Sequence, residues 1–270
     1  MIKLNDKLVI QTHFPDNSLR IETDYKEPVF DLSWMGMGAN VKKLTWHYEN
    51  DAELFTIICI RKHFDKQDMI LEMPYCPHAR MDRVKNPNEF FTLKHFADVI
   101  NSLNFNEVRI LDPHSNVCTA LINNVKVEHP QEMINKAISS IPDKTNLIAF
   151  YPDEGAMKRG TDYVKGAYAF GIKKRDWETG KILGLELMNK DIVKDRDILI
   201  IDDICSRGGT FYHSAKALKD AGAKNIYLYI THCENTILDG ELLTSGLIEK
   251  VYTTNSIFTK EHEKIEVFKL

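Results

Sequence analysis

The sequence predicts an α/β protein built from mostly parallel sheets, and three patterns in the chain support this fold class. Short β-branched segments alternate with segments of helical periodicity, as in βαβ units. The alternation occurs on both sides of a turn-rich break, so the 270 residues divide into two lobes of ordinary domain size. Several predicted strands run into acidic residues or histidine, which is typical of ligand sites at the carboxyl edge of parallel sheets.

The first series contains two predicted strands and one predicted helix. Met69–Glu72 and Val108–Leu111 are short and apolar, as buried strands are. Glu89–Leu103 has apolar residues at helical spacing, so we expect a helix there. Its predicted core-facing residues are Phe90, Leu93, Phe96, Ala97 and Ile100.

The second series is longer and ends in a glycine-rich region. Helices are expected over Gln131–Ile141 and Phe211–Ala221, the second of which is stopped by Gly222. The expected strands are Leu147–Tyr151, Tyr168–Ile172, Leu183–Met188, Asp197–Ile201 and Asn225–Ile230. The turn-rich residues 141–145 place the domain boundary, giving an N-terminal domain of residues 1–141 and a C-terminal domain of residues 142–270. The last residues of the C-terminal domain could pack back on the N-terminal domain.

Composition excludes several classes of protein. Hydrophobic residues make up 43% and charged residues 27% of the chain, which argues against disorder. A net charge of −4 does not indicate a nucleic-acid partner. The start of the chain has no signal-like apolar stretch, and runs such as Phe55–Ile60 are too short to cross a membrane. The 5 widely spaced cysteines fit reduced thiols, so we expect a cytoplasmic protein.

Residues 198–211 combine an apolar strand, two adjacent carboxylates and a glycine pair in one candidate phosphate site. The carboxylates suit the neighbouring hydroxyls of a sugar. The glycines let backbone N–H groups turn toward an anion, and the following helix adds its unpaired donors and positive dipole end. The predicted site residues are Asp202, Asp203, Ser206, Arg207, Gly208, Gly209 and Thr210.

This array resembles the phosphoribosyl pyrophosphate (PRPP) loop of type I phosphoribosyltransferases and of ribose-phosphate diphosphokinases, which are also called PRPP synthetases. The usual loop reads Asp-Thr-Gly-Gly-Thr, and here Ser206 and Arg207 stand at its first two positions. The resemblance implies that the loop holds the 5-phosphate of ribose 5-phosphate. It also implies that Asp202 and Asp203 bind the ribose hydroxyls or their associated cation. The loop alone does not distinguish an enzyme that makes PRPP from one that consumes it.

The first half of the chain resembles the diphosphokinases. Residues 73–83 look like their ATP-contacting segment, Pro-Tyr-x-x-x-Ala-Arg-Gln-Asp-(Arg/Lys), with Met81 in place of Gln. Residues 14–18 resemble the adenine-binding Phe-x-Asp-Gly-Glu loop, with Ser18 in place of Glu, and residues 112–114 stand where the family has Asp-Leu-His. The ATP-binding residues implied by this resemblance are Phe14, Asp16, Arg80, Asp82, Arg83 and His114.

Two segments of the second half carry the implied catalytic and metal-binding residues. Tyr151–Gly155, followed by Lys158 and Arg159, resembles the Pro-Asp-x-Gly loop that handles pyrophosphate and Mg²⁺. Residues 173–175 fit the Lys-x-Arg pair of a catalytic flap, and residues 176–181 contain its expected turn, Thr179-Gly180. By resemblance, the catalytic residues are Lys173, Arg175 and His114, and the metal ligands are His114, Asp153, Asp202 and Asp203.

The resemblance covers about residues 10 to 257 and implies two tandem phosphoribosyltransferase-like lobes. The implied reaction is ATP + ribose 5-phosphate → PRPP + AMP with Mg²⁺, in a homo-oligomer that is a dimer or larger. Neither a nucleic acid nor a membrane is expected as a partner. Two alternatives remain, a PRPP-dependent phosphoribosyltransferase and a non-catalytic regulatory subunit of the same fold. Residues 22–49 have no clear match in the family.

Overall fold

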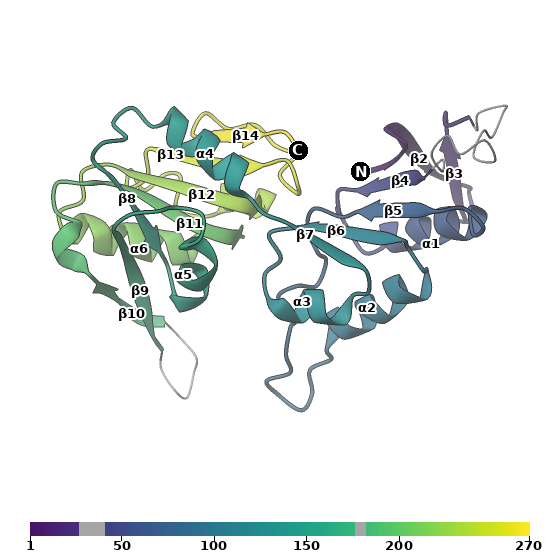
Figure 1. The fold of residues 1–270 in the computed structure, drawn as a ribbon, viewed down its shortest axis with the longest axis horizontal. Helices are drawn as coiled ribbons and strands as arrows, with labels where there is room; N and C mark the ends of the chain where they lie inside the picture. Colours follow the sequence, from purple (N-terminus) through teal and green to yellow (C-terminus); the bar gives the residue numbers. More distant parts are fainter. Residues whose placement is uncertain (27–40, 176–181) are drawn as a thin grey trace. The chain divides into compact units, whose positions relative to one another are not determined.

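The computed structural model describes residues 1–26, 41–175 and 182–270. These residues form two compact α/β units, Met1–Glu128 and His129–Leu270 (Figure 1). The sequence predicts a domain boundary after residue 141, whereas the two compact units meet between Glu128 and His129. The predicted boundary therefore stays a prediction. No helix in the described ranges has both the length and the apolar character that a membrane crossing requires.

The first unit is built on a seven-stranded mixed sheet with the order β3-β2-β1-β4-β5-β6-β7. The strands are β1 (Ile2–Leu4), β2 (Lys7–His13), β3 (Leu19–Thr23), β4 (Lys42–Trp46), β5 (Met69–Glu72), β6 (Glu107–Leu111) and β7 (Val125–Glu128). Its helices are α1 (Glu53–His63), α2 (Thr92–Ser102) and α3 (Asn116–Leu121). Strands β4 to β7 are parallel, β1 is antiparallel to both β2 and β4, and β2 and β3 form a hairpin.

Helix α2 shows how the apolar spacing builds the core of this unit. Leu93, Phe96, Ala97 and Ile100 are buried on one face, as the sequence predicts. The prediction that Phe90 faces the core is wrong, because Phe90 is 77% exposed. The helix begins at Thr92, so Phe90 lies before its first turn and does not share the buried face.

The second unit is also built on a seven-stranded sheet, with the order β10-β9-β8-β11-β12-β13-β14. The strands are β8 (Leu147–Tyr151), β9 (Tyr168–Arg175), β10 (Ile182–Met188), β11 (Asp197–Cys205), β12 (Ile226–Cys233), β13 (Lys250–Thr254) and β14 (Ile265–Phe268). The helices are α4 (Gln131–Ser140), α5 (Glu154–Gly160) and α6 (Gly209–Asp220), with 3₁₀ helices at Lys190–Ile192 and Asn235–Asp239. All neighbours in this sheet are parallel except β9 and β10.

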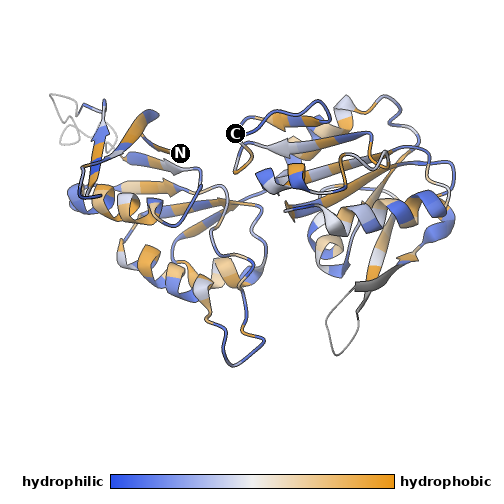
Figure 2. Ribbon diagram, turned by 180° about the vertical axis from the view of Figure 1, so that it is seen from behind, coloured by the Kyte–Doolittle hydropathy of each residue, from blue (hydrophilic) through white to orange (hydrophobic). Residues whose placement is uncertain are grey.

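The apolar strands of the second unit are buried on both faces. All eight residues of β12 are buried, as are the first five residues of β11. Figure 2 shows hydrophobic residues gathered along the strands of the sheet. Such continuous burial is typical of parallel strands covered by helices on both sides. The predicted α/β class with helix-flanked sheets is therefore confirmed. Both sheets are mixed, since β9 and β10 are antiparallel in the second unit and three of the six strand pairs are antiparallel in the first.

The strand order of the second unit reverses between β8 and β11. From β8 the chain continues to β9 and β10 on one side, and then returns to β11 on the other side of β8. Pairing of β11 with β8 ends at Ile200, whereas its pairing with β12 continues to Cys205. The end of β11 therefore extends past β8 at a point where open α/β sheets bind ligands.

Candidate functional site

Two buried carboxylates lie on the part of β11 that extends past β8. The sequence places the end of this strand at Ile201, but the strand continues to Cys205 because β12 still pairs with it. Asp202 and Asp203 are therefore strand residues, with side chains only 13% and 4% exposed. Two acidic groups in such a position need a positive partner, because an isolated buried charge is costly.

That partner is Arg159 in the last turn of α5. Its Nη2 atom lies 2.5 Å from Asp203 Oδ1 and 3.2 Å from Asp202 Oδ1. Burial and the negative charge of Asp203 raise the pKa of Asp202 well above its ordinary value, and the Arg159 charge opposes this shift. The sequence shows Arg159 after the Pro-Asp-x-Gly segment but does not indicate its contact with the acidic pair.

Asp153 joins this cluster through α5. It is the residue that caps the helix, since its Oδ1 accepts a hydrogen bond from the Ala156 amide at 3.0 Å. Its negative charge contributes to the raised pKa of Asp202. Asp153, Arg159, Asp202 and Asp203 therefore gather at the carboxyl ends of β8 and β11, where the strand order reverses.

The glycine-rich loop after β11 leads into a helix, as the sequence predicts. Gly208 has a φ of +78°, a region that favours glycine, and it precedes the first residue of α6. The helix thus begins at Gly209, two residues before the predicted start at Phe211. The first amides of a helix have no partner within the helix, so this end of α6 can bind an anion.

Gly240 supports the same loop from a distant part of the chain. A Cβ atom at this position would lie 1.9 Å from the carbonyl oxygen of Arg207, closer than any real contact. Leu242, two residues further on, packs on the loop as well, since a Cβ at Gly208 would lie 3.0 Å from the Leu242 Cδ2 atom. The sequence offers no local signal for Gly240, because its contact joins segments that are far apart in the chain.

In the first unit, the predicted adenine loop is the tip of the β2–β3 hairpin. Phe14 is 50% exposed, and its amide donates to the Ser18 carbonyl at 2.9 Å. The Ser18 amide donates to Asp16 Oδ1 at 2.9 Å, and this bond lowers the pKa of Asp16. Asp16 therefore stays ionised and keeps its capacity to accept hydrogen bonds.

The predicted ATP segment after β5 is anchored at its start and exposed further on. The Met73 amide donates to the Arg109 carbonyl at 2.9 Å, and the Leu111 amide donates to the Pro74 carbonyl at 3.0 Å. Arg80 and Arg83 are exposed, and Arg83 Nε lies 3.8 Å from Asp82 Oδ1. The start of the segment is thus fixed on β6, and Arg80 and Arg83 lie further on at the surface.

His114 follows the neighbouring strand β6. Asp112, with a φ of +43°, turns the chain before it, and α3 begins two residues after it. His114 is half-buried, and the adjacent Ser115 Oγ is buried without a hydrogen-bond partner among the described residues. Because β5 and β6 are adjacent and parallel, His114 and the segment with Arg80 leave the same edge of the sheet.

The hairpin tip leaves that edge too, but at another place. Strand β2 runs in the direction of β4 and β5, because β1 is antiparallel to both β2 and β4. Strands β1 and β4 separate β2 from β5, which corresponds to about 14 Å at three strand spacings. The unit therefore brings His114 and the segment with Arg80 together but leaves Phe14 and Asp16 apart.

The predicted catalytic pair of the flap lies at the end of β9. In the backbone, Lys173 is paired with Leu185 and Arg175 with Ile182, so β9 and β10 form the expected antiparallel connection. The side chains of this pair and the turn at residues 176–181 lie outside the described part of the structure.

The predicted metal ligands are divided between the units, with His114 in the first and the three aspartates in the second. Within the described ranges, no group of three or more His, Cys, Asp or Glu side chains has the arrangement of a metal site. Asp202 and Asp203 still fit a hard divalent cation, because carboxylate oxygens are its preferred ligands. Burial and the negative charge of Asp203 raise the pKa of Asp202, and a bound cation would oppose both effects.

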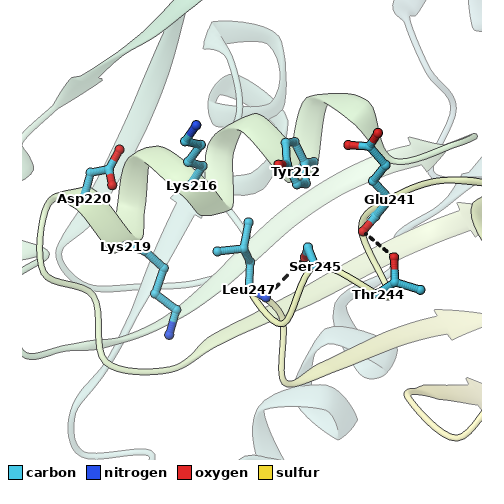
Figure 3. Close-up of a pocket in the computed structure, with 8 residues that line it drawn as sticks. All are labelled: Tyr212, Lys216, Lys219, Asp220, Glu241, Thr244, Ser245 and Leu247. Atoms are coloured by element: carbon cyan, nitrogen blue, oxygen red, sulfur yellow. Dashed lines mark hydrogen bonds between the residues drawn. The ribbon is translucent and has the colours of Figure 1, made fainter.

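A separate cavity of about 510 Å³ lies along α6 (Figure 3). It is lined by Tyr212, Lys216, Lys219, Asp220, Glu241, Thr244, Ser245 and Leu247. None of these residues belongs to the predicted site. Helix α6, which follows the phosphate loop, supplies four of the lining residues.

Proteins of one family match most of this chain in sequence. The ribose-phosphate pyrophosphokinase of Staphylococcus epidermidis is 30% identical over 225 residues, which is 78% of this chain and 67% of that protein. The enzyme of the same name from Saccharolobus solfataricus is 27% identical over 219 residues, covering 80% of this chain and 74% of the relative. That of Aquifex aeolicus is 26% identical over 275 residues, covering 98% and 84%.

The fold has a solved counterpart. A crystal structure of phosphoribosylpyrophosphate synthetase from Mycobacterium smegmatis matches with a TM-score of 0.76 and 17% sequence identity, covering 97% of this chain and 86% of that one. No family model matches the sequence. The structural likeness establishes the fold, and the identity and coverage of the curated relatives establish descent: the chain belongs to the ribose-phosphate pyrophosphokinase family.

Proposed function

We propose that this chain makes PRPP by transferring the β,γ-pyrophosphoryl group of ATP to the C1 hydroxyl of ribose 5-phosphate, with release of AMP. The observation that carries the proposal is the placement of Asp202 and Asp203 near the end of β11, from which a short loop leads into the start of α6. A sugar phosphate has neighbouring hydroxyls and a phosphate in one molecule. The acidic pair suits the hydroxyls, and the loop suits the phosphate.

In this proposal the loop of residues 206–210 binds the 5-phosphate. Its backbone amides and the hydroxyls of Ser206 and Thr210 are hydrogen-bond donors, and the exposed Arg207 adds a positive charge. Asp202 and Asp203 accept from the ribose hydroxyls, which orients the C1 hydroxyl for attack on the β-phosphorus. Such positioning is a main source of rate in phosphoryl transfer.

The first unit supplies the proposed ATP-binding residues. The exposed ring of Phe14 offers a surface on which adenine can stack, and the ionised Asp16 can accept from the exocyclic amine. The exposed Arg80 and Arg83 carry the planar donors that suit phosphate oxygens. His114 donates a hydrogen bond to a phosphate oxygen of ATP or ligates the metal ion that the phosphates bind.

Mg²⁺ is the proposed cation, and its proposed ligands are Asp153, Asp202 and Asp203 in the second unit and His114 in the first. When bound, it would neutralise phosphate charge and orient the transferring group. Arg159 offsets part of the negative charge of the acidic pair in the absence of the cation, and it opposes the rise in the pKa of Asp202.

The proposed catalytic residues of β9 act on the charge of the transferring group. Lys173 and Arg175 would donate to the pyrophosphoryl oxygens as negative charge shifts toward the leaving AMP. A preorganised donor of this kind contributes about 10²–10³ in rate. We further propose that the protein is a homo-oligomer and that it acts in the cytoplasm, where thiols stay reduced.

The test is a ³¹P NMR time course of the full chain with Mg²⁺, ATP and ribose 5-phosphate. We expect AMP and a C1-pyrophosphate signal to appear together, and only when both substrates are present. Asp203→Asn should abolish the signals, whereas Asp98→Asn, on an exposed side chain of α2, should leave them unchanged.

Other outcomes would refute the proposal in different ways. Formation of ADP and a singly phosphorylated sugar would identify an ordinary kinase. No reaction with ATP, followed by consumption of PRPP in the presence of a nucleobase, would identify a phosphoribosyltransferase. No turnover in either assay would identify a non-catalytic relative.

A further inference from the structure

Two buried cysteines meet in the core of the first unit. Cys76 lies in the segment that follows β5, and Cys118 lies in α3. Both belong to the same apolar cluster, and their residues are 2% and 0% exposed. The two Sγ atoms are 2.7 Å apart, although the residues are 42 positions apart in the chain. An S–S bond is about 2.05 Å long, so a further approach of only ~0.7 Å would join them.

We propose that Cys76 and Cys118 form a reversible disulfide when the protein meets hydrogen peroxide, and that they are a modification site of this chain. One thiolate attacks an oxygen of the peroxide, which gives a sulfenic acid and releases hydroxide. The sulfur of the other cysteine then attacks the sulfenic sulfur, and the hydroxyl group leaves as water. Overall, two thiols lose two electrons and two protons, and the peroxide becomes two molecules of water.

The surroundings keep the pair reduced under ordinary conditions. Burial, with the Cys118 thiol beside it, raises the pKa of Cys76, and the thiolate is the reactive form. Oxidant must also reach sulfurs that are closed off from solvent. Reaction therefore proceeds through local opening of the segment after β5, whose continuation is exposed from Val84 to Asn88.

The disulfide would tie together two segments of the proposed ATP site. The segment with Cys76 continues to Arg80, and α3 begins two residues after His114. Fixing this segment on α3 removes the freedom with which it can adapt to a nucleotide. We expect oxidation to raise the KM for ATP about threefold or more, an expectation that rests on the proposed function.

The experiment treats the full-length chain with hydrogen peroxide, blocks remaining thiols by alkylation, and maps peptides by mass spectrometry. We expect a linked peptide pair containing Cys76 and Cys118, lighter by two hydrogen atoms and separated again by dithiothreitol. Cys76→Ser and Cys118→Ser should each abolish the link. The matched control is Cys59→Ser, on the half-buried cysteine of α1 in the same unit, which should leave it unchanged.

Two results would overturn the modification site. One is complete alkylation of Cys76 and Cys118 in peroxide-treated protein whose other thiols are oxidised. The other is a disulfide between Cys205 and Cys233, which are partners in register on β11 and β12, in place of the proposed one. Mapping of the wild-type chain decides this even if a serine variant fails to fold.

The link to the nucleotide site has its own test. ATP kinetics are measured before oxidation, after oxidation and after reduction, in the wild-type chain and in Cys76→Ser. A mapped disulfide with unchanged KM for ATP would leave the modification site in place and refute its effect on nucleotide binding. Absence of all turnover in the reduced protein would instead count against the proposed function.

Discussion

Replacing Arg159 tests whether this residue acts as the counter-charge of the acidic pair. Arg159→Met keeps much of the side-chain length and removes the guanidinium that lies 2.5 Å from Asp203 and 3.2 Å from Asp202. Loss of one partner from a buried ion pair costs about 3–5 kcal/mol. Two features reduce this figure. The Arg159 side chain is 30% exposed, and Asp202 can take up a proton because its pKa is already raised.

We therefore expect Arg159→Met to lower the free energy of unfolding by about 2 kcal/mol, which corresponds to a fall in Tm of about 4–8 °C. Urea denaturation and calorimetry measure these changes. The matched control is Lys158→Met, on the exposed neighbour in the same helix, which should change the stability little. Mg²⁺ should restore more stability to Arg159→Met than to the wild-type chain, because the cation replaces the missing charge.

A double-mutant cycle decides whether the effect passes through the carboxylates. In an Asp203→Asn background, Arg159→Met should cost clearly less, since the amide needs no counter-charge. An equal loss in both backgrounds would refute the reasoning, because Arg159 would then stabilise α5 by packing alone. An unchanged Tm in the single variant would refute it as well.

Three further predictions follow from single features of the second unit. Lys173→Ala should lower kcat by about 10²–10³ with unchanged circular dichroism, and unchanged turnover in steady-state kinetics would remove it from the catalytic residues. Gly240→Ala should lower the free energy of unfolding by about 1–3 kcal/mol and raise the KM for ribose 5-phosphate, because the new Cβ collides with the Arg207 carbonyl. Gly209→Ala, whose Cβ meets nothing within 4 Å, is its stability control in denaturant titrations. Burial and the charge of Asp203 raise the pKa of Asp202, so the folded state binds this proton more tightly than the unfolded state does. The group therefore destabilises the fold as the pH rises from the ordinary pKa of 3.8 through the higher pKa of the folded state. Asp202→Asn should flatten this part of the stability–pH profile, and an unchanged slope would contradict the assignment.

The phosphate loop could be predicted from the sequence because its structure is decided locally. An apolar strand, two glycines and a helix start follow each other within 14 residues, residues 198–211, and each favours its conformation through its own neighbours. The predicted helix start at Phe211 differs from the observed start at Gly209 by only two residues. The spacing of apolar residues likewise predicts the buried face of α2, where Leu93 and Ile100 lie.

Other features depend on contacts between distant segments. Whether β11 stops at Ile201 or continues to Cys205 is decided by β12, which pairs with it to the end. The contact of Arg159 with Asp203 spans 44 residues and requires α5 to pack beside β11. Neither the extension of β11 nor the contact of Arg159 with Asp203 depends on a periodic pattern in the sequence. The turn before α2 exposes Phe90 for a related reason, since apolar spacing does not define where a helix begins.

The sheet order of the first unit bears on how a nucleotide can be bound. Phe14 and Arg80 leave the same edge of the sheet, but β1 and β4 separate their strands, which places them about 14 Å apart at the level of the sheet. Arg80 follows the end of β5 by eight residues, so the loop that carries it also affects this separation. The strand spacing favours two arrangements, in which Phe14 and Arg80 contact different parts of one ATP, or Phe14 contacts a nucleotide bound mainly by another copy of the chain. The second arrangement would make the proposed homo-oligomer a requirement for ATP binding, because neither copy would then hold a complete nucleotide site of its own.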